Sequence, residues 1–504
     1  MIRLYDTARR EKVPLQPLED GRLGVYVCGP TVYDMCHVGH ARCYVGFDVV
    51  IRHLRASGFK VRYVRNITDV DDKIIRRAAE LGEDPLELSA RMAEEFHRDM
   101  RALGNRDPDV EPTVSGHIPE VVALTQRIIE SGHAYPMGGD VYFEVGSFPA
   151  YGALSHRNLD ELRSGARVEV DERKRNPLDF ALWKAAKAGE PSWESPWGRG
   201  RPGWHIECSA MSSRYLGDRF DIHGGGMDLI FPHHENELAQ SRAVAGPESF
   251  ARFWMHNGFI TVRTAENAEE KMSKSLGNFF TIRQVCERYE PEALRLFLLG
   301  THYRSPIAFE VDATPGGQAR FVSLEEAERR LSYSYATLAR LDAALATGKP
   351  AGKGTVLPEV AGFEGRLQAA LDDDFNTAAA LGHLAELLTF ANKLLDQPGL
   401  CPKDVRRRTL ESARAGLRRA AEVLGVLAEE PQAFLTRRRD RLAAARGIEG
   451  ALVERRIAER AAARQAKDFA AADQVRQELA DRGVELMDGP TGTTWRIAED
   501  LPKP

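Results

Sequence analysis

The pattern of apolar and polar positions is clearest near the start of the chain, where it predicts a strand, a helix and a second strand. The apolar run LGVYVCG, residues 23–29, is typical of a buried strand. Apolar residues then recur at helical spacing after Gly39 as far as Gly58, and a glycine commonly follows the end of a helix. KVRYVRNITD, residues 60–69, predicts the second strand, and Asp69 to Asp72 open a further helix. This order predicts a right-handed parallel crossover.

The pattern changes at later points in the chain. From Asp107 to Gly203 the residues are polar and rich in proline and glycine, which favours an inserted subdomain over a continuation of the sheet. The sheet pattern resumes in GWHIECSAMSSRYLG and in FDIHGGGMDLIF. Beyond Pro291 the composition becomes helical, and residues 324–427 are typical of a helix bundle. From Gly450 we expect one long helix, followed by a small, turn-rich terminal module.

Composition limits the class of protein. The 504 residues are 43% hydrophobic and 28% charged, and this length predicts several domains rather than one. No apolar run is long enough to span a bilayer, and the charged N-terminal stretch lacks a signal-peptide pattern, so we expect a cytoplasmic protein without a membrane segment. With 69 basic and 74 acidic residues the net charge is −5, so any RNA binding must depend on local basic faces. No segment has the pattern of a dimerisation helix, and a monomer is expected.

The first motif that carries chemistry is HVGH, His37 to His40, in the turn between the first strand and its helix. We expect free backbone N–H groups and the positive end of the helix dipole at this turn, an arrangement that binds phosphate. The two imidazoles can add hydrogen bonds to a phosphoryl group, and Gly39 allows close approach to the backbone. The same four letters also suit a zinc-binding pair, or two histidines without a special role.

The second motif is KMSKS, Lys271 to Ser275. Lys271 and Lys274, with small hydroxyl residues beside them, can form a cationic loop that holds a polyphosphate leaving group. A solvated lysine loop explains this motif equally well when it is taken alone.

A third group of residues suggests a metal site. The six cysteines are too few and too scattered for a disulfide framework, which leaves free thiols as candidate ligands. Cys28 closes the first predicted strand, and we expect Cys208, in WHIECS, at another strand end. His233 and Glu237 are four residues apart and would share one helix face. Two thiolates, an imidazole and a carboxylate can form a tetrahedral zinc site. The alternative is two buried cysteines and an unrelated surface pair.

HVGH after a strand and KMSKS later in the chain together resemble the two signature motifs of class I aminoacyl-tRNA synthetases. A resemblance to the cysteinyl-tRNA synthetase family covers nearly the full chain, in YVCGPTVYDMCHVGHAR, NITDVDDKII, PLDFALWKAAK, GWHIECSAMS, DIHGGGMDLIFPHHENELAQS, KMSKSLGN, LDDDFNTAAAL and DGPTGTTW. The resemblance implies an α/β fold with a Rossmann-type parallel sheet. It divides the chain into 1–106 and 204–320, the two halves of the catalytic domain; 107–203, an inserted connective subdomain; 321–430, an all-α helix bundle of the DALR type; and 431–504, a small anticodon-binding module.

The resemblance also implies ligands and roles for individual residues. One Zn²⁺ per chain would be bound by Cys28, Cys208, His233 and Glu237, whereas Cys36 and Cys43 would only pack. ATP with Mg²⁺ would contact His37, Gly39, His40, Gly226, Asp228, Lys271 and Lys274. Of these, His37, His40, Lys271 and Lys274 would be catalytic. L-Cysteine would contact Gly29, Thr31, Thr68, Trp204 and His223. The macromolecular partner would be tRNA(Cys), with Trp495 stacked on one of its bases.

A zinc ion has a clear purpose in recognising cysteine. A pocket that reads shape alone separates such similar side chains by only about 10–200-fold. A thiol with an ordinary pKa of about 8.5 ionises readily on the metal, whereas the alcohol of serine does not. Four protein ligands form a closed site, so we expect Glu237 to loosen when the substrate binds.

Three alternatives use part of the same pattern. The family that joins cysteine to an amino sugar shares the zinc and both signatures but lacks an RNA-binding part, which the long helical region after Pro291 argues against. A methionyl-tRNA synthetase would carry a four-cysteine knuckle, and Asp107 to Gly203 contains no cysteine. A non-catalytic RNA-binding or zinc protein would have no need for both histidines, both lysines and the four ligands.

Overall fold

The computed structural model describes residues 1–157, 174–264, 270–271, 279–313, 319–346, 355–489 and 492–498. The chain divides into two compact units. The first comprises Met1–Leu331 and Pro350–Val426, and the second comprises Ser332–Lys349 and Leu427–Pro504. Among the described residues, no helix combines the length and the apolar composition needed to cross a membrane.

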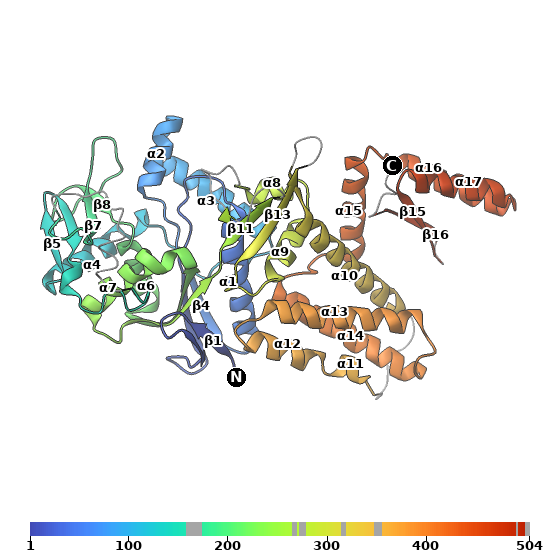
Figure 1. Ribbon diagram of the computed structural model, residues 1–504, viewed down its shortest axis with the longest axis horizontal. Helices are drawn as coiled ribbons and strands as arrows, with labels where there is room; N and C mark the ends of the chain where they lie inside the picture. Colours follow the sequence, from blue (N-terminus) through green and yellow to red (C-terminus); the bar gives the residue numbers. More distant parts are fainter. Residues whose placement is uncertain are drawn as a thin grey trace. The chain divides into compact units, whose positions relative to one another are not determined.

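A parallel sheet of four strands forms the centre of the first unit, in the order β10-β9-β3-β4. Its strands are β3 (Arg22–Val27), β4 (Lys60–Arg65), β9 (Arg219–Gly226) and β10 (Phe250–Asn257). Helix α1 (Val38–Ala56) connects β3 to β4, as the pattern predicted, and Gly58 follows its end with φ 96°. Because all four strands are parallel, their carboxyl ends meet at one edge, where ligands bind in this type of fold. Helix α1 lies beside β4 (Figure 1).

The tract between β4 and β9 forms helices and a second, antiparallel sheet. Asp71 caps α2 (Asp72–Leu81) by accepting a hydrogen bond from the Lys73 amide, which confirms the predicted start of that helix. The antiparallel sheet has the order β5-β6-β7-β8. The elements here are α3 (Pro85–Ala102), η1 (Ser115–His117), α4 (Ile118–Glu130), β5 (Ala134–Met137), β6 (Asp140–Phe143), η2 (Val145–Ser147), β7 (Phe180–Ala185) and β8 (Gly200–Pro202).

Two expectations about the second half of this unit are wrong. GWHIECSAMSSRYLG does not resume the sheet, because residues Ile206–Leu216 form helix α6. Its apolar residues Ile206, Ala210 and Met211 are buried at helical spacing, a period that the small residues between them obscure. The chain after Pro291 is also not purely helical. After α9 (Pro291–Leu299) it forms strand β13 (Ile307–Ala313), which belongs to a third sheet with the order β12-β11-β13-β14.

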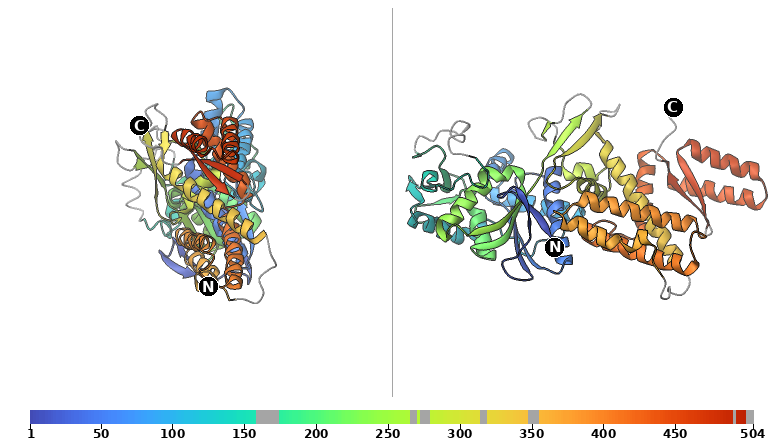
Figure 2. Two further views of the ribbon diagram at one scale, coloured as in Figure 1. Left: turned by 90° about the vertical axis from the view of Figure 1, so that its right-hand side faces the viewer. Right: turned by 60° about the horizontal axis from the view of Figure 1, so that its bottom comes forward.

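The bundle helices α12 (Phe363–Asp372), α13 (Thr377–Asp396) and α14 (Lys403–Leu424) pack side by side, as predicted (Figure 2). The remaining elements of the first unit are β1 (Arg3–Asp6), β2 (Glu11–Pro14), η3 (Met227–Leu229), η4 (Ile230–His234), α7 (Glu235–Ala245), β11 (Ile260–Thr264), β12 (Glu270–Lys271), α8 (Ile282–Cys286), β14 (Ala319–Phe321) and α11 (Pro358–Ala361). Helix α10 (Val322–Ala346) begins in the first unit and ends in the second.

The second unit contains a small module with its own core. It consists of α15 (Pro431–Ala445), α16 (Gly450–Gln465), α17 (Phe469–Asp481) and the antiparallel strands β15 (Val484–Gly489) and β16 (Gly492–Ile497). The single long helix expected from Gly450 is therefore two helices. The chain turns at Lys467, whose φ is 61°, and the Asp468 side chain caps α17 by accepting from the Ala471 amide.

Trp495 does not have the exposed position that stacking on a base requires. Its side chain is 3% exposed and packs in the core of the module, and its indole N–H donates to Glu454 Oε1 at 2.7 Å. A module of this size has few large apolar residues, and its tryptophan is needed for the core. The prediction that Trp495 contacts RNA is therefore wrong.

Arg295 on α9 connects four segments of the first unit. Its fully buried guanidinium pairs with Asp48 of α1 at 2.5 Å and donates to the carbonyls of Leu103 and Leu424 and to Asn105 Oδ1. Burial raises the pKa of Asp48, but Arg295 and Arg52 outweigh it and hold that pKa below its ordinary value. The carboxylate is therefore charged, and its position depends on the arginine.

We expect Arg295→Met to lower the free energy of unfolding by about 3–5 kcal/mol, since it leaves the buried Asp48 carboxylate without its closest partner. Urea unfolding monitored by circular dichroism measures this loss. Arg98→Met is the matched control, because the Arg98 side chain is 67% exposed in its pair with Glu95 and should cost less than about 1 kcal/mol. Equal effects from the two substitutions would contradict this role of Arg295.

Candidate functional site

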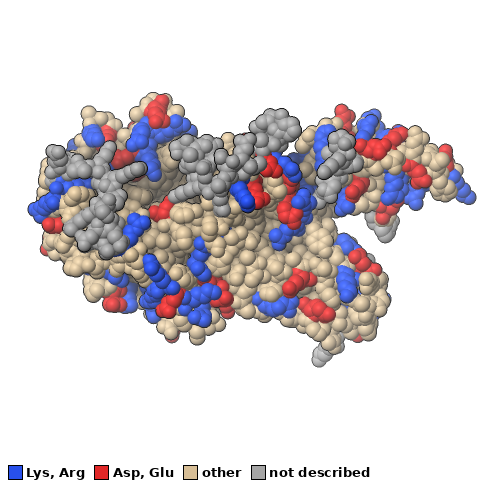
Figure 3. All heavy atoms as spheres, viewed as in Figure 1, with Lys and Arg blue, Asp and Glu red and all other residues tan. Residues whose placement is uncertain are grey.

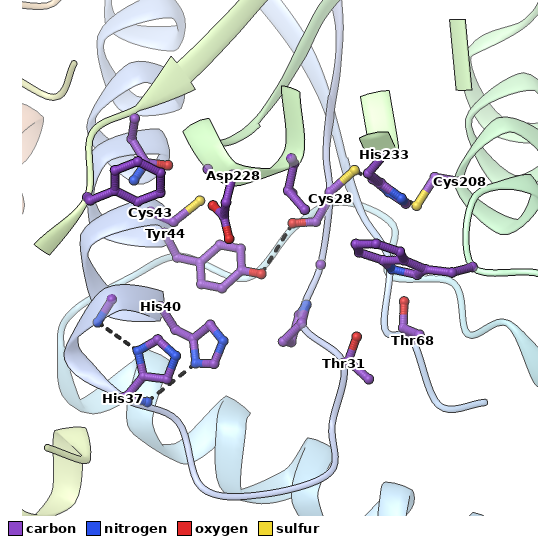
Figure 4. Close-up of a pocket in the computed structure, with 18 of the residues that line it drawn as sticks. Cys28, Thr31, His37, His40, Cys43, Tyr44, Thr68, Cys208, Asp228 and His233 are labelled. Atoms are coloured by element: carbon purple, nitrogen blue, oxygen red, sulfur yellow. Dashed lines mark hydrogen bonds between the residues drawn. The ribbon is translucent and has the colours of Figure 1, made fainter. Parts of the chain in front are cut away.

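A cavity of about 320 Å³ lies at the carboxyl ends of the central strands. Figure 4 shows His37 and His40 toward one end of this cavity, and Cys28, Cys208 and His233 toward the other. Most of the residues singled out from the sequence line it: Cys28, Gly29, Thr31, His37, Gly39, His40, Thr68, Trp204, Cys208, Gly226, Asp228 and His233. His223 and Glu237 are fully buried and are not among the lining residues, so His223 does not reach the cavity as the expected contact with L-cysteine requires. Only the backbone of Lys271 is described, in β12, and Lys274 lies outside the described residues.

The two histidines of HVGH form the N-terminal cap of α1. His37 Nδ1 accepts from the Gly39 amide at 3.0 Å, and His40 Nδ1 accepts from the His37 amide at 3.3 Å. The two rings stack with their centroids 3.9 Å apart. The Val38 amide donates to the Phe280 carbonyl at 3.2 Å. The expectation of free backbone N–H groups at this turn is therefore wrong, because these amides already have partners.

The same cap determines which nitrogen of each imidazole carries a proton. A ring nitrogen that accepts a hydrogen bond has no proton, so each neutral ring is protonated at Nε2. Both rings line the cavity, and their Nε2–H groups are hydrogen-bond donors. If this turn binds a phosphoryl group, the donors are the imidazoles rather than the backbone.

The donor atoms of Cys28, Cys208, His233 and Glu237 all lie within 4.8 Å of one another. The two sulfur atoms are 3.9 Å apart, and His233 Nε2 is 2.9 Å from Glu237 Oε1. Cys208 is on α6 rather than at a strand end, so a strand end (Cys28), α6 and the η4–α7 segment supply the group. All four side chains are buried.

The electrostatics of this group favour anionic donors. Burial raises the pKa of Glu237, but the charges of His223 and His233 outweigh burial and lower it to about 2. Burial also raises the pKa of Cys208, whereas hydrogen bonds with Cys28 and His233 lower it to about 6. Burial lowers the pKa of His233, and Glu237 raises it to about 10. A thiolate and a carboxylate therefore face an imidazolium, and a metal ion bound here would take over its positive charge, with release of the His233 proton.

A second set of donors, Cys28, His223, His234 and Glu237, satisfies the same distance limit. Its two histidines are hydrogen-bonded, His223 Nε2 at 3.0 Å from Glu237 Oε2 and His234 Nδ1 at 2.7 Å from His256 Nε2, as His233 of the first set is to Glu237 and His205. Neither histidine lines the cavity, whereas Cys208 and His233 of the first set do. The first set therefore has the better position for a metal that a ligand in the cavity can reach.

Trp204 and Thr68 form one wall of the cavity beside these donors. The Trp204 side chain is 37% exposed, and its ring stacks on His233 with centroids 4.6 Å apart. Trp204 is therefore a wall residue of the cavity and not a core aromatic. At the facing strand end, a Cβ on Gly29 would lie 1.5 Å from the Asn66 carbonyl oxygen, so a side chain is excluded there.

The structure adds lining residues that the sequence did not indicate. They include Tyr33, Tyr44, Lys73, Glu207, Asn257 and Phe259. Cys43, which we expected only to pack, also lines the cavity, whereas Cys36 is buried outside the lining. Glu207 stands next to Cys208 in WHIECS, and that position was the one signal available for it.

Comparisons with known proteins agree with this architecture. Residues 14–315 match the family described as the tRNA synthetases class I (C) catalytic domain, 366–428 match the DALR domain, and 450–496 match the cysteinyl-tRNA ligase anticodon binding domain. The cysteine–tRNA ligase of Anaeromyxobacter dehalogenans strain 2CP-1 is 57% identical over 501 residues, covering 98% of this chain and 99% of that protein. The cysteine–tRNA ligase of Geobacter sulfurreducens is 50% identical over 499 residues, with 98% and 99% coverage.

Solved structures support the fold. A Mycobacterium tuberculosis methionyl-tRNA synthetase in complex with methionyl-adenylate superposes with a TM-score of 0.59 at 17% identity, over 82% of this chain and 93% of that one. A leucyl synthetase from Agrobacterium radiobacter K84, solved in a ternary complex, gives 0.57 at 12% identity over 83% and 86%. The whole-length identity to the Anaeromyxobacter and Geobacter proteins shows more than the fold: the chain belongs to the cysteine–tRNA ligase family of class I aminoacyl-tRNA synthetases.

Proposed function

We propose that the chain activates L-cysteine with ATP and then transfers cysteine to the 3′ end of tRNA(Cys), with a Zn²⁺ ion that recognises the substrate thiol. The observation that carries this proposal is that one cavity contains both a candidate phosphate-binding group and a candidate metal-binding group. An imidazole pair with Nε2 donors lies toward one end, and a thiolate-rich donor group lies toward the other. The family membership supports the same reaction.

The residues fit a zinc ion. Two sulfurs bound to a tetrahedral zinc with Zn–S bonds of about 2.3 Å lie about 3.8 Å apart. The separation between Cys28 Sγ and Cys208 Sγ is 3.9 Å, and Cys28 Sγ is 3.5 Å from Glu237 Oε1. We propose that Cys28, Cys208, His233 and Glu237 hold the ion. When bound, it supplies a Lewis-acidic contact that prefers a soft thiolate to an alcohol. His223, hydrogen-bonded to the second oxygen of Glu237, orients that carboxylate.

At the other end of the cavity we assign ATP. Gly39 and the Nε2–H groups of His37 and His40 approach the α-phosphoryl group, while Gly226 and Asp228 contact the adenosine. The cysteine carboxylate attacks the α-phosphorus, a new P–O bond forms, and the bond to pyrophosphate breaks. Lys271 and Lys274 hold the departing pyrophosphate together with Mg²⁺. The carboxylate is already ionised, so that positioning and charge stabilisation are sufficient and no general base is needed.

We propose that the segments predicted from the sequence have separate roles in this reaction. Residues 1–106 and 204–320 carry activation, 107–203 is the connective insertion, 321–430 is the bundle, and 431–504 binds the anticodon region. On the face of the C-terminal module that Figure 3 shows, basic and acidic side chains are interspersed, so RNA binding on that face would depend on individual contacts rather than on one charged patch. We propose a monomer that acts in the cytoplasm, where ATP and tRNA are available.

ATP–pyrophosphate exchange with cysteine, serine and methionine tests the reaction. We expect exchange with cysteine, and at least about 100-fold lower kcat/KM with serine, because an alcohol lacks the ionised sulfur that the metal prefers. Exchange that is strongest with serine or methionine, or absent with all three amino acids, would contradict the proposal.

Replacing a metal ligand tests the zinc assignment. We expect Cys208→Ser to lower bound zinc below one per chain and to raise the KM for cysteine by about 10-fold or more, while the KM for ATP stays unchanged. Zinc content by elemental analysis and exchange kinetics measure both effects. Cys401→Ser, in the loop between α13 and α14, is the control and should change neither. Full zinc occupancy in Cys208→Ser would show that the ligand set is wrong.

With Trp495 buried, Phe469 becomes the candidate for a base contact in the module. Its ring is 62% exposed at the start of α17. We expect Phe469→Ala to raise the KM for tRNA(Cys) by about 10-fold in aminoacylation and to leave ATP–pyrophosphate exchange unchanged, since base stacking contributes about 1–3 kcal/mol. Leu400→Ala removes a comparably exposed apolar side chain from the bundle region and should change neither rate. An unchanged KM for tRNA in Phe469→Ala would rule out the contact.

A further inference from the structure

Glu207 is a carboxylate in the wall of the cavity that lacks a partner of opposite charge. It is 1% exposed and lines the cavity, and it precedes Cys208 on α6. Within the part of the chain that the structure describes, its carboxylate accepts a single hydrogen bond, from Thr68 Oγ1 at 2.8 Å, and has no ion pair within 4.0 Å. Burial raises the pKa of Glu207 well above its ordinary value, so the ionised form is costly unless a cation reaches it.

The hydrogen bonds around Thr68 leave acceptors facing the cavity. The Thr68 hydroxyl donates its proton to Glu207 and accepts from Asn66 Nδ2 at 3.1 Å. Asn66 Oδ1 in turn accepts from the Gly29 amide at 2.8 Å. In this hydrogen-bond network, the second oxygen of Glu207 and one lone pair of the Thr68 hydroxyl can therefore still accept hydrogen bonds. These two acceptors are complementary to a cationic donor such as an ammonium group.

The position of Glu207 and Thr68 in the cavity indicates which group of the substrate they can bind. Cysteine carries a thiol, a carboxylate and an α-ammonium group, and the proposed reaction assigns the thiol to the metal and the carboxylate to ATP. Two carboxylates line the cavity, and Asp228 belongs to the segment assigned to adenosine. Glu207 is consecutive with Cys208, and Figure 4 places Thr68 on the side of Cys208 rather than of His37. The thiol and the ammonium group of cysteine are on neighbouring carbons, so they need neighbouring partners.

We propose that Glu207, with the hydroxyl of Thr68, binds the α-ammonium group of cysteine. This inference rests on the proposed function, because it takes cysteine as the ligand and places its thiol at the metal. Glu207 is then a recognition residue that contributes binding energy and orients the carboxylate of cysteine toward ATP. Asn66 is a positioning residue that fixes the Thr68 hydroxyl.

The experiment compares two thiols that each lack one group of cysteine. Cysteamine keeps the thiol and the ammonium group, and 3-mercaptopropionate keeps the thiol and the carboxylate. Calorimetric titrations use the zinc-loaded, full-length protein and its Glu207→Gln variant. Glutamine keeps the size of the side chain and can still accept from Thr68. Glu328→Gln makes the same change at another buried glutamate, on α10, and is the matched control.

In Glu207→Gln we expect the Kd of cysteamine and the KM for cysteine to rise by about 30-fold or more, as for the loss of one partner of a buried charge pair. The Kd of 3-mercaptopropionate and the zinc content should stay within about 2-fold of the wild-type values. Equal weakening of both thiols, or no weakening of cysteamine, would overturn the inference. If neither thiol binds the wild-type protein and no exchange occurs with cysteine, the proposed function itself fails.

A measurement on the wild-type protein covers the case in which the variant does not fold. 1-Propanethiol has the size of cysteamine but no charge. A carboxylate at the ammonium position makes cysteamine bind at least about 10-fold more tightly than 1-propanethiol. Equal affinities would show that no counter-charge acts at this position.

Discussion

The buried Glu237 carboxylate is the interaction on which the geometry of the site depends. One oxygen lies 2.9 Å from His233 and the other lies 3.0 Å from His223 of β9, so that the carboxylate joins α7 to the central sheet. A charge at 0% exposure is tolerated only with such partners, and losing one of them leaves the charge uncompensated. The sulfur of Cys28, at the end of β3, lies 3.5 Å from the same carboxylate. The docking of α7 and the convergence of the metal donors are thus one arrangement.

Backbone contacts join the ATP end of the cavity to the segment that follows KMSKS. The Val38 amide donates to the Phe280 carbonyl, and the Ile282 amide donates to the Cys36 carbonyl at 3.0 Å. Arg42, one turn into α1, donates to the carbonyls of Thr301 and His302, just before β13. The third sheet, which includes β11 and β13, is therefore held by the same helix that presents His37 and His40. The HVGH turn and the segment that begins at Phe279, far apart in sequence, are therefore both anchored on α1.

Local signals predicted well, and signals that depend on tertiary contacts did not. The β3–α1–β4 crossover followed from an apolar run, a helical period and the Asp71 cap, all of which act within a few residues. Helix α6 was mistaken for part of the sheet because it is buried on most sides and shows no clear polar face. Whether Trp495 is buried or exposed depends on how many other apolar residues the module can bring into its core, which no local pattern shows. Glu207 and Asn66 were missed because a single acidic or amide residue usually faces solvent, and only the fold brings them to Thr68.

The site separates affinity from selectivity. Serine and cysteine carry the same ammonium and carboxylate groups, so the proposed contacts with Glu207, Thr68 and ATP would stabilise both substrates equally and could not distinguish them. Discrimination must come from the donors around Cys208 and His233, where the only chemical difference between the two substrates lies. The proposed contacts would hold either amino acid with its side chain directed at the proposed zinc site, and the preference of zinc for a thiolate would then act on a correctly placed atom in each case. A strong contact with the ammonium group would therefore support selectivity indirectly, because it places the substrate side chain next to the proposed zinc, the group that distinguishes a thiol from an alcohol.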